Sequence, residues 1–267
     1  MHATQTMTMR VALVTLALAA STIASAQDNS TFKWDAQLVD GRTVFLHNIN
    51  GAVTFEAGSG NTVEVTAIKR WRRGDGSGVR IEARQVGSGD IVICAFWNDN
   101  ATCDEDGYHG NRSRDRDDRD EDGVSVEFTV RIPAHARVSA STVNGDLRVD
   151  GTRADIEAHT VNGDLEAYST AGLVEAGTVN GSITVRTAAD GTEDLHYSTV
   201  NGSVTVQIVS DANLDVNLST VNGSITSDFP MTLDGRINPR HVRATIGNGG
   251  PQLRVRTVNG SIRLRKQ

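Results

Sequence analysis

The stretch TVNGDLRV begins at Thr142, and its first four residues return unchanged five more times along the chain. The six copies of TVNG begin at Thr142, Thr160, Thr178, Thr199, Thr220 and Thr257. Their starts are separated by 18, 18, 21, 21 and 37 residues, which indicates structural repeats of similar size with one longer excursion before the last copy. A single active site needs no such regularity, so we interpret the motif first as architecture.

Apolar residues alternate with polar ones on both sides of each copy. The residues two and four before the Thr are apolar, as in Val138 and Ala140, and apolar residues recur after the Gly, as in Leu147 and Val149. Because successive strand side chains point to opposite faces, each repeat is predicted to hold two short strands with one buried and one wet face. Asn-Gly between the strands allows an abrupt reversal, since Gly takes positive φ without steric cost.

Two all-β architectures fit this periodicity. In a β-solenoid each repeat is one coil and equivalent TVNG corners stack, whereas in an antiparallel meander or sandwich Asn-Gly is a hairpin turn. The corner sequence is constant while the other turn varies in length, which favours the repetitive β-solenoid with two short strands per 18–21-residue repeat. The predicted structural corners are Asn144, Gly145, Asn162, Gly163, Asn180, Gly181, Asn201, Gly202, Asn222, Gly223, Asn259 and Gly260. Within the 37-residue gap, ATIGNGG from Ala244 is predicted to be a degenerate corner.

The first 26 residues have the features of a secretory signal. Arg10 precedes the apolar run VALVTLALAA, and Ala24-Ser25-Ala26 supplies a cleavage site before Gln27. This run is shorter than the roughly 20 apolar residues that span a bilayer, so a transmembrane anchor is disfavoured. We therefore expect export to the periplasm or the cell surface, without a transmembrane segment after signal removal.

The mature chain is expected to have three parts. They are an N-terminal β-strand region over residues 27–103, a charged flexible loop over 104–123, and the TVNG-repeat β-solenoid over 124–267, which continues the N-terminal strands. The loop DEDGYHGNRSRDRDDRDEDG carries nine acidic and four basic residues and almost nothing apolar, so it cannot bury enough surface to offset its ordering entropy.

Charge bears on the possible ligands. The signal removes only Arg10, which leaves 25 basic against 33 acidic residues and a net charge of −8. This excess disfavours nucleic acid as a partner. The loop offers a calcium alternative through Asp115, Asp117, Asp118, Asp120 and Asp122, but it lacks the Gly and Glu of the EF-hand pattern and its arginines neutralise the field.

The two cysteines are predicted to form a disulfide, because an exported chain meets an oxidising compartment. In IVICAFWNDNATC, a turn centred on Asn98-Asp99 would place Cys94 directly opposite Cys103 on an antiparallel hairpin. A thiol nucleophile or metal site is disfavoured, because no His or second Cys pair lies nearby in the sequence.

Candidate catalytic groups are few. Asp146 and Asp164 follow successive corners and would stack about 5 Å apart in a solenoid, but later repeats carry Ser at this position, which favours a small polar residue leaving a turn. No nucleophile-elbow, zinc-protease or phosphate-loop motif is present. The histidines show no metal-ligand spacing: His47, His109, His135, His159, His196 and His241. We predict neither a cofactor nor a metal.

The chain resembles a known group, the bacterial putative-adhesin or toast-rack family of β-strand repeat proteins. The resemblance rests on the serial TVNG corners, on VEFTVRIPAHARV before the first of them, on ICAFW ahead of the charged loop, and on the closing IGNGGPQLRVRTVNGSIRLRK, and it extends from about Phe45 to Lys266. It implies an exported, repetitive β-solenoid-like domain and carries over no catalytic residues. The 104–123 loop looks like an insertion of this chain.

The leading functional hypothesis is a non-enzymatic, adhesin-like scaffold or binding module of the cell envelope. Its partner would be an unknown protein or glycan that lies along a flat sheet face. The alternative is a carbohydrate-active β-helix enzyme, which would require acidic groups converging on one stretch of a sheet face or cleft.

Overall fold

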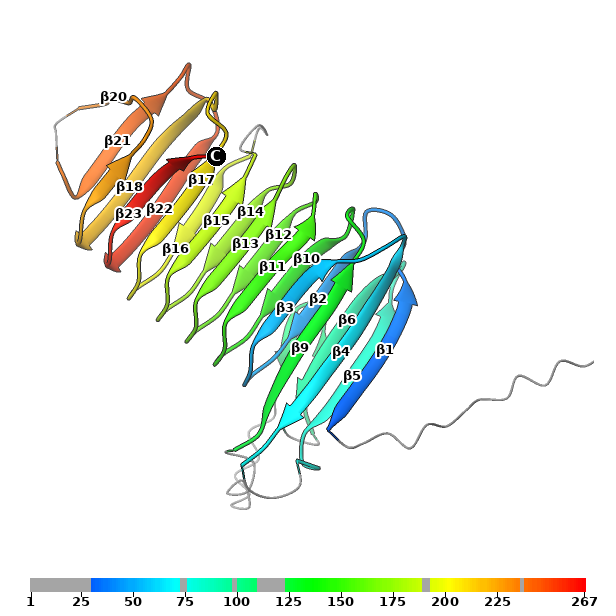
Figure 1. The fold of residues 1–267 in the computed structure, drawn as a ribbon. Coiled ribbons are helices and arrows are strands. Elements are labelled where there is room, and N and C mark those ends of the chain that lie inside the picture. Colours follow the sequence, from blue (N-terminus) through cyan, green and yellow to red (C-terminus); the bar gives the residue numbers. More distant parts are fainter. Residues whose placement is uncertain (1–29, 73–75, 98–99, 110–122, 189–192, 236–237) are drawn as a thin grey trace, which may run out of the picture.

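Two large sheets face each other along the length of the protein (Figure 1). The computed structural model describes residues 30–72, 76–97, 100–109, 123–188, 193–235 and 238–267. These residues contain no helix, and thus none long and apolar enough to cross a membrane. The predicted signal 1–26 and most of the predicted charged loop, residues 110–122, lie outside the described residues.

Sheet A has ten strands and sheet B has eleven. In spatial order, sheet A consists of β1 (Thr31–Gln37), β4 (Thr62–Arg70), β9 (Ser125–Ile132), β3 (Val53–Ala57), β11 (Leu147–Thr152), β13 (Leu165–Ser169), β15 (Ile183–Thr187), β17 (Val204–Ile208), β23 (Ile262–Lys266) and β19 (Ile225–Ser227). Sheet B consists of β20 (Thr232–Leu233), β21 (His241–Ile246), β18 (Leu214–Asn222), β22 (Gln252–Asn259), β16 (Leu195–Ser198), β14 (Val174–Gly177), β12 (Ile156–His159), β10 (Arg137–Ser141), β2 (Thr43–His47), β6 (Asp90–Phe96) and β5 (Arg80–Val86). A third sheet pairs β7 (Thr102–Asp104) with β8 (Gly107–His109).

Each TVNG repeat is one coil of a solenoid. The chain runs along a strand of sheet B, turns at TVNG, and returns along a strand of sheet A, as β10 does into β11. Neighbouring coils pair in parallel and in register, so that Val138 lies beside Ile156 and Leu147 beside Leu165. The predicted repetitive β-solenoid is therefore confirmed, and the antiparallel meander is wrong for the repeats.

The core fills the space between the two sheets. The alternating apolar residues of the repeats point inward and are almost completely buried, as are Leu165, Ile183 and Val204 in sheet A. The residues between them point outward and are partly or fully exposed. Strands of parallel sheets usually have continuous apolar sequences, because helices cover both faces of the sheet. Here the outer face of each sheet is exposed to solvent, so apolar and polar residues alternate along the strands.

The TVNG corners stack on one flank through side-chain hydrogen bonds. Each corner Asn donates its amide Nδ2 to the Oδ1 of the Asn in the adjoining coil, at 2.7–2.9 Å. Each Thr donates its hydroxyl to the carbonyl oxygen of the adjoining coil's Gly, at 2.8–3.4 Å. A chain of amides in one orientation polarises its members in the same sense, which strengthens each bond.

The corner glycines are required by close contact between coils. A Cβ on Gly145, Gly163, Gly181 or Gly202 would lie closer than 3.0 Å to the carbonyl oxygen of the preceding corner's Gly. None of these four has positive φ. The expectation that Gly serves through positive φ is therefore wrong for these four, although Gly51 and Gly260 do have positive φ. The missing side chain is what lets the backbones approach.

A seventh corner precedes the six TVNG copies. Asn50 pairs with Asn144 and accepts its amide proton at 2.7 Å, and Gly51 accepts from Thr142. This corner, within HNINGA, joins β2 to β3 and begins the stack. The sequence signal was the Asn-Gly pair itself, but it lacks the preceding Thr-Val and stands 94 residues before its partner.

The coils are not stacked in sequence order. β22 lies between β16 and β18, and β23 lies between β17 and β19. The final TVNG coil, at Thr257, is thus inserted between the coils of Thr199 and Thr220, and the order of the corner Asn residues ends with 201, 259 and 222. The strands of the inserted coil are parallel to both neighbours.

The predicted degenerate corner ATIGNGG is wrong. Ala244 and Ile246 lie in β21, which pairs with β18 in an antiparallel sense. The following glycines carry the chain from β21 across the end of β18 to β22, and a Cβ on Gly247, Gly249 or Gly250 would meet Asn213 or Asp215 at 3.0 Å or closer. Glycine is again used for close backbone approach, but in a crossing loop and not in the corner stack.

Antiparallel strands cover most ends of the sheets. β1 pairs with β4 at one end of sheet A, and β5 pairs with β6 at the same end of sheet B. At the other end, sheet B continues into β21 and β20, whereas sheet A ends in β19, which has only three residues. Short edges and edges that break the repeat are known devices against edge-to-edge aggregation.

Replacing Gly163 by Ala should lower the free energy of unfolding by about 2–3 kcal/mol, because the new methyl group overpacks the corner and separates two coils. Urea denaturation followed by circular dichroism measures this change. Gly60→Ala is the control: its Cβ would meet nothing within 4 Å, and its φ of +64° costs only about 1 kcal/mol. Equal losses in the two variants would show that coil contact is not the constraint.

The inserted coil predicts which engineered cysteines form a disulfide. Thr205 and Arg263 are register neighbours, so a T205C/R263C pair should oxidise. Thr205 and Thr226 lie two strands apart, about 10 Å, beyond the reach of a disulfide, so a T205C/T226C pair should not. Peptide mapping by mass spectrometry distinguishes these bonds from the native one. A disulfide in T205C/T226C but not in T205C/R263C would show that the coils are stacked in sequence order and that the inserted coil is wrong.

Candidate functional site

The acidic residues that follow the corners have structural partners. Asp146 Oδ1 accepts the backbone N–H of Asp164 at 2.9 Å, and Asp164 Oδ1 accepts that of Ser182 at 2.8 Å. Ser182 and Ser203 accept the backbone N–H of the next coil in the same way. These side chains therefore tie one coil to the next, in agreement with the interpretation of a small polar residue leaving a turn.

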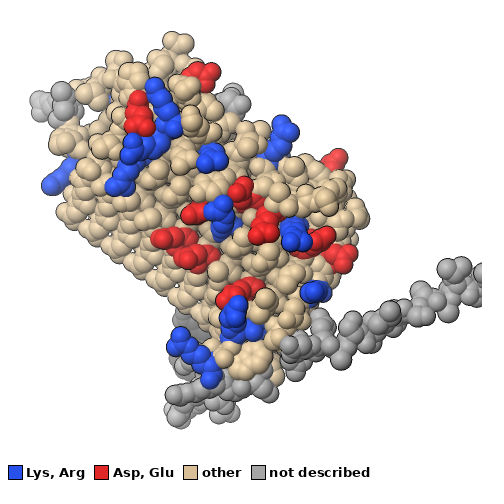
Figure 2. All heavy atoms as spheres, viewed as in Figure 1, with Lys and Arg blue, Asp and Glu red and all other residues tan. Residues whose placement is uncertain are grey.

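The outer face of sheet A carries an exposed cluster around Tyr168, which we call the Tyr168 patch. The guanidinium carbons of Arg148 and Arg186 lie 5.2 and 5.0 Å from the centre of the Tyr168 ring. Glu166 forms an ion pair with Arg148 and accepts a hydrogen bond from the Tyr168 hydroxyl at 3.3 Å. Figure 2 shows charged residues of both signs spread over the body of the protein.

Strand register assembles this patch. Arg148 on β11 lies beside Glu166 on β13, and Tyr168 lies beside Arg186 on β15. Burial raises the pKa of Tyr168, and the negative charge of Glu166 raises it further, so the hydroxyl stays protonated and donates to Glu166. The patch offers a flat ring edge, guanidinium donors and a carboxylate on one surface.

The outer face of sheet B carries an acidic groove of about 320 Å³ over β10, β12 and β14. Its carboxylates are Asp155, Glu157, Glu175, Glu193 and Asp194. Arg137 forms an ion pair with Asp155 at 3.5 Å and is the groove's one basic residue among the described lining residues. No three of the described His, Cys, Asp or Glu side chains converge closely enough to form a metal-binding group.

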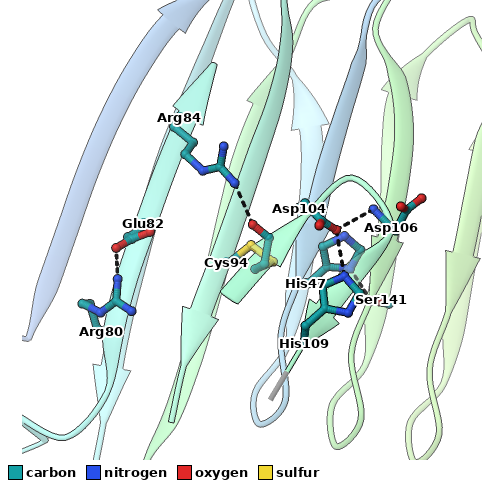
Figure 3. The surroundings of a disulfide bond; sticks show 10 residues. His47, Arg80, Glu82, Arg84, Cys94, Asp104, Asp106, His109 and Ser141 are labelled. Carbon is teal, nitrogen blue, oxygen red and sulfur yellow. Dashed lines mark hydrogen bonds and ion pairs between the residues drawn. A yellow bond between two sulfur atoms is a disulfide. The ribbon is translucent and has the colours of Figure 1, made fainter. Parts of the chain in front are cut away.

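The predicted disulfide between Cys94 and Cys103 is confirmed, with Cα atoms 6.5 Å apart (Figure 3). The predicted hairpin around it is wrong. Both edges of the strand that holds Cys94, β6, are already paired with β5 and β2, so Cys103 reaches it from above the sheet, on β7. The predicted turn at 98–99 lies outside the described residues, and Gly107–His109, expected to be loop, form β8.

The small β7–β8 hairpin covers the outer face of sheet B near its N-terminal end. Cys103 and Ala101 pack with Cys94, Val92 and Phe96 in a second apolar cluster outside the main core. Arg84 donates to the Cys103 carbonyl at 2.7 Å. The disulfide therefore fastens a lid of about ten residues onto an otherwise exposed apolar patch.

His47 is buried beneath this hairpin. Its Nδ1 lies 2.8 Å from the Ser141 hydroxyl, its Nε2 is buried without a partner among the described residues, and only 8% of the residue is exposed. Burial lowers its pKa below the ordinary 6.5, although the charge of Asp104 opposes this. Since the unfolded chain binds this proton more tightly, stability is full above about pH 6.5 and falls as the pH drops through that value.

The other candidate histidines and acidic residues named from the sequence do not converge with His47 on a common site. Asp104 bonds His109 at 3.0 Å above His47 (Figure 3), while His135 pairs with Asp40 and His159 with Glu157. The calcium candidates Asp115, Asp117, Asp118, Asp120 and Asp122 lie outside the described residues. Sequence reasoning missed the Tyr168 patch, because its members come from three different coils and meet only through the register of β11, β13 and β15.

Comparison with known proteins agrees with this geometry. The family described as Toastrack DUF4097 matches residues 53–265, which is most of the chain. The chain belongs to the Toastrack DUF4097 family. The match begins at β3 and ends within β23. It therefore contains all six TVNG corners but not the first corner, Asn50-Gly51. No curated protein matches the chain.

Two solved structures were found to be similar to this Toastrack chain. One is described as a putative cell adhesion protein from Clostridium sporogenes ATCC 15579; it is 9% identical, with a TM-score of 0.44, and the match covers 89% of this chain and all of that one. The other is described as a putative adhesin from Bacteroides fragilis NCTC 9343; it is 11% identical, with a TM-score of 0.35, and covers 89% of this chain and 97% of that one.

Removing the disulfide with C94S/C103S should lower the free energy of unfolding by about 2–3 kcal/mol, as expected for a short closed loop. The hairpin should also lift from the sheet, so the pKa of His47 should rise towards 6.5 as water reaches the ring. Chemical denaturation measures the first effect, and NMR titration of the imidazole protons measures the second. A pKa of His47 equal to that in the wild type would show that the hairpin stays docked without its disulfide.

Proposed function

We propose that this Toastrack protein is an exported, adhesin-like binding module of the cell envelope, which holds a protein or glycan on the outer face of sheet A without turning it over. The observation that carries the proposal is the Tyr168 patch, which lies on a flat wet face that repeats at one strand spacing. An extended polymer could follow such a face over several coils, since neighbouring strands lie about 4.8 Å apart.

The chemistry of the patch suits recognition of polar chains. Tyrosine presents an apolar ring together with a polar hydroxyl, and arginine donates planar, directed hydrogen bonds. Arg186 stacks on the ring and donates to Gln207 at 3.1 Å, so its remaining N–H groups face solvent near further hydroxyl and amide groups. Thr184 and Thr205 extend the polar surface along the neighbouring strands.

The carboxylates of this face support binding over hydrolysis. Asp150 and Glu166 both contact Arg148, whose charge neutralises them. A carbohydrate-active enzyme needs an acid and a base or nucleophile that point at one bond, whereas these two carboxylates hold an arginine. The supporting role of Asp146 and Asp164 in the corners points the same way.

Export is supported by two separate features. The signal-like residues 1–26 precede the fold, and the Cys94–Cys103 disulfide is of a kind that persists in oxidising compartments. Fractionation of the producing cells, followed by mass spectrometry of the N-terminus, should find a chain beginning at Gln27 in the periplasm or at the cell surface.

Binding of the mature protein to an array of envelope glycans and to immobilised envelope proteins tests the function. Tyr168→Ala should raise the dissociation constant of the captured ligand at least about 10-fold, because binding loses an aromatic anchor. Arg131→Ala is the matched control on the same face; it lies three strands away in sheet A and pairs with Glu56 and Glu64.

Two results would contradict the proposal. In the first, the Tyr168 and Arg131 variants bind every captured ligand as the wild type does. In the second, the mature protein releases products from a polysaccharide and loses this turnover when a surface carboxylate is changed, which would favour the enzyme.

A further inference from the structure

The outer face of sheet A becomes basic on one side of the Tyr168 patch. The strands β15, β17 and β23 follow β13 in the sheet, and alternate residues along them point outward. These outward residues carry hydroxyls, one amide and three guanidiniums, and none of them is acidic: Thr184, Arg186, Thr205, Gln207, Arg263 and Arg265. We call this surface the arginine strip.

Two of the three arginines keep an uncompensated charge. Arg265 pairs with Asp228 at 3.1 Å, whereas Arg186 and Arg263 form no ion pair with the described residues of the chain. Arg186 donates through Nε to Gln207 at 3.1 Å and lies 5.0 Å from the Tyr168 ring centre, so its two terminal amino groups are left to bind a ligand. The strip is therefore locally cationic on a chain whose net charge is −7.

Strand register places these two arginines on opposite sides of β17. Arg186 on β15 lies beside Gln207, and Arg263 on β23 lies beside Thr205. Each arginine is thus one strand spacing, about 4.8 Å, from β17. The β17 side chains between them are shorter than arginine, so an anionic group above β17 can meet both guanidiniums and the Thr205 hydroxyl.

Acidic residues bound the strip on both sides. On the side of β13 and β11, the outward positions include Glu166 and Asp150, which hold Arg148. On the side of β19, Asp228 holds Arg265. An anionic chain is therefore attracted over β15, β17 and β23 and repelled beyond them, with Tyr168 at the boundary.

We propose that the arginine strip binds an acidic polysaccharide, whose carboxylate or sulfate group lies above β17 between Arg186 and Arg263. Arginine holds such groups with parallel, charge-assisted hydrogen bonds. Thr184 and Thr205 bond the hydroxyls of the sugar rings on either side. This inference rests on the proposed function, in which the outer face of sheet A holds a ligand, and it names the class of that ligand.

The composition of the face favours a polysaccharide over an acidic peptide. Protein partners gain most of their binding energy from aromatic and apolar side chains that fill pockets. The large apolar side chains that are exposed in the described part of the chain lie in the corners and near the sheet ends, as Val143 and Leu233 do, and none lies on β11, β13, β15, β17 or β23. Apart from Tyr168, the strip and its surroundings offer hydroxyls and charges, which match a chain that is polar on all sides.

Binding of the mature protein to four defined polymers tests the ligand class. They are polygalacturonate, which bears carboxylates, dextran sulfate, uncharged dextran, and poly-glutamate as the acidic peptide. Biolayer interferometry should show binding to polygalacturonate, dextran sulfate or both, and these two arms identify the acidic group. The binding should weaken as the salt is raised from about 0.05 M to about 0.5 M, because salt screens exposed charges.

Substitutions of the two arginines locate the site. Arg186→Gln and Arg263→Gln should each raise the dissociation constant at least about 10-fold, since each removes charge-assisted hydrogen bonds. Arg263→Lys keeps a cation without the planar fork, so its affinity should lie between those of Arg263→Gln and the wild type. Arg131→Gln is the matched control: it removes the same charge from β9, four strands from β15, and should change the constant less than about 2-fold.

The outcomes separate this inference from the proposed function. Failure to bind either acidic polysaccharide, equally tight binding of dextran or poly-glutamate, or wild-type affinity in both Arg186→Gln and Arg263→Gln would each overturn the acidic polysaccharide. If a neutral glycan or a protein is then captured and lost in Tyr168→Ala, the proposed function stands without this inference. Binding that is lost in the arginine variants but unchanged in Tyr168→Ala would support the arginine strip and contradict the role proposed for Tyr168.

Discussion

The approach of one corner glycine to the next determines the rest of this structure. The backbones of successive corners lie so close that no side chain fits between them, and this contact fixes the spacing and rotation of each coil relative to its neighbour. The Thr hydroxyl then bonds the neighbouring Gly carbonyl, and the Asn amides bond one another. A hydrogen bond is worth only about 1 kcal/mol net, but a shift by one residue would break the whole set together and turn every apolar side chain outward.

Register fixed at one flank spreads across both sheets. Because each coil leaves its corner in the same direction, Leu147, Leu165 and Ile183 meet in the core, and the residues between them meet on the outside. Outward positions are then free to differ from coil to coil. The Tyr168 patch on sheet A and the acidic groove on sheet B are both made from such positions, so a constant corner supports outer surfaces that differ from coil to coil.

Much of this fold could be predicted from the sequence because local pattern and global structure agree within each repeat. Alternation of apolar and polar residues predicted the inward faces, the constant corner sequence favoured stacking, and the short spacing between Cys94 and Cys103 in a chain expected to be exported favoured a disulfide. The order of the coils could not be predicted, for a physical reason. Every TVNG corner carries the same residues, so by local chemistry the coil at Thr257 fits equally well between the coils of Thr199 and Thr220 or after the coil of Thr220.

What selects the inserted order lies outside the repeats. The strand β21 reverses direction to pair with β18, and glycines 247, 249 and 250 allow the chain to pass over the end of that strand and enter the remaining position. The Tyr168 patch and the hairpin over His47 were missed for a related reason. Their residues come together through pairing between distant segments, and no short stretch of sequence contains the pattern.

The two flanks of the solenoid differ in what they can accommodate. At the corners, the coils lie about 4.8 Å apart and leave no room for an insertion. The residue between Thr and Asn is the same in each copy, as in Val143, Val161 and Val179, which are each about two-fifths exposed. The opposite turns vary in length from coil to coil, so longer segments can emerge there and at the sheet ends, including the 37-residue excursion and the disulfide-linked hairpin. Elaboration of this fold is therefore confined to one flank, the ends and the outer faces, and binding surfaces must be built from those parts.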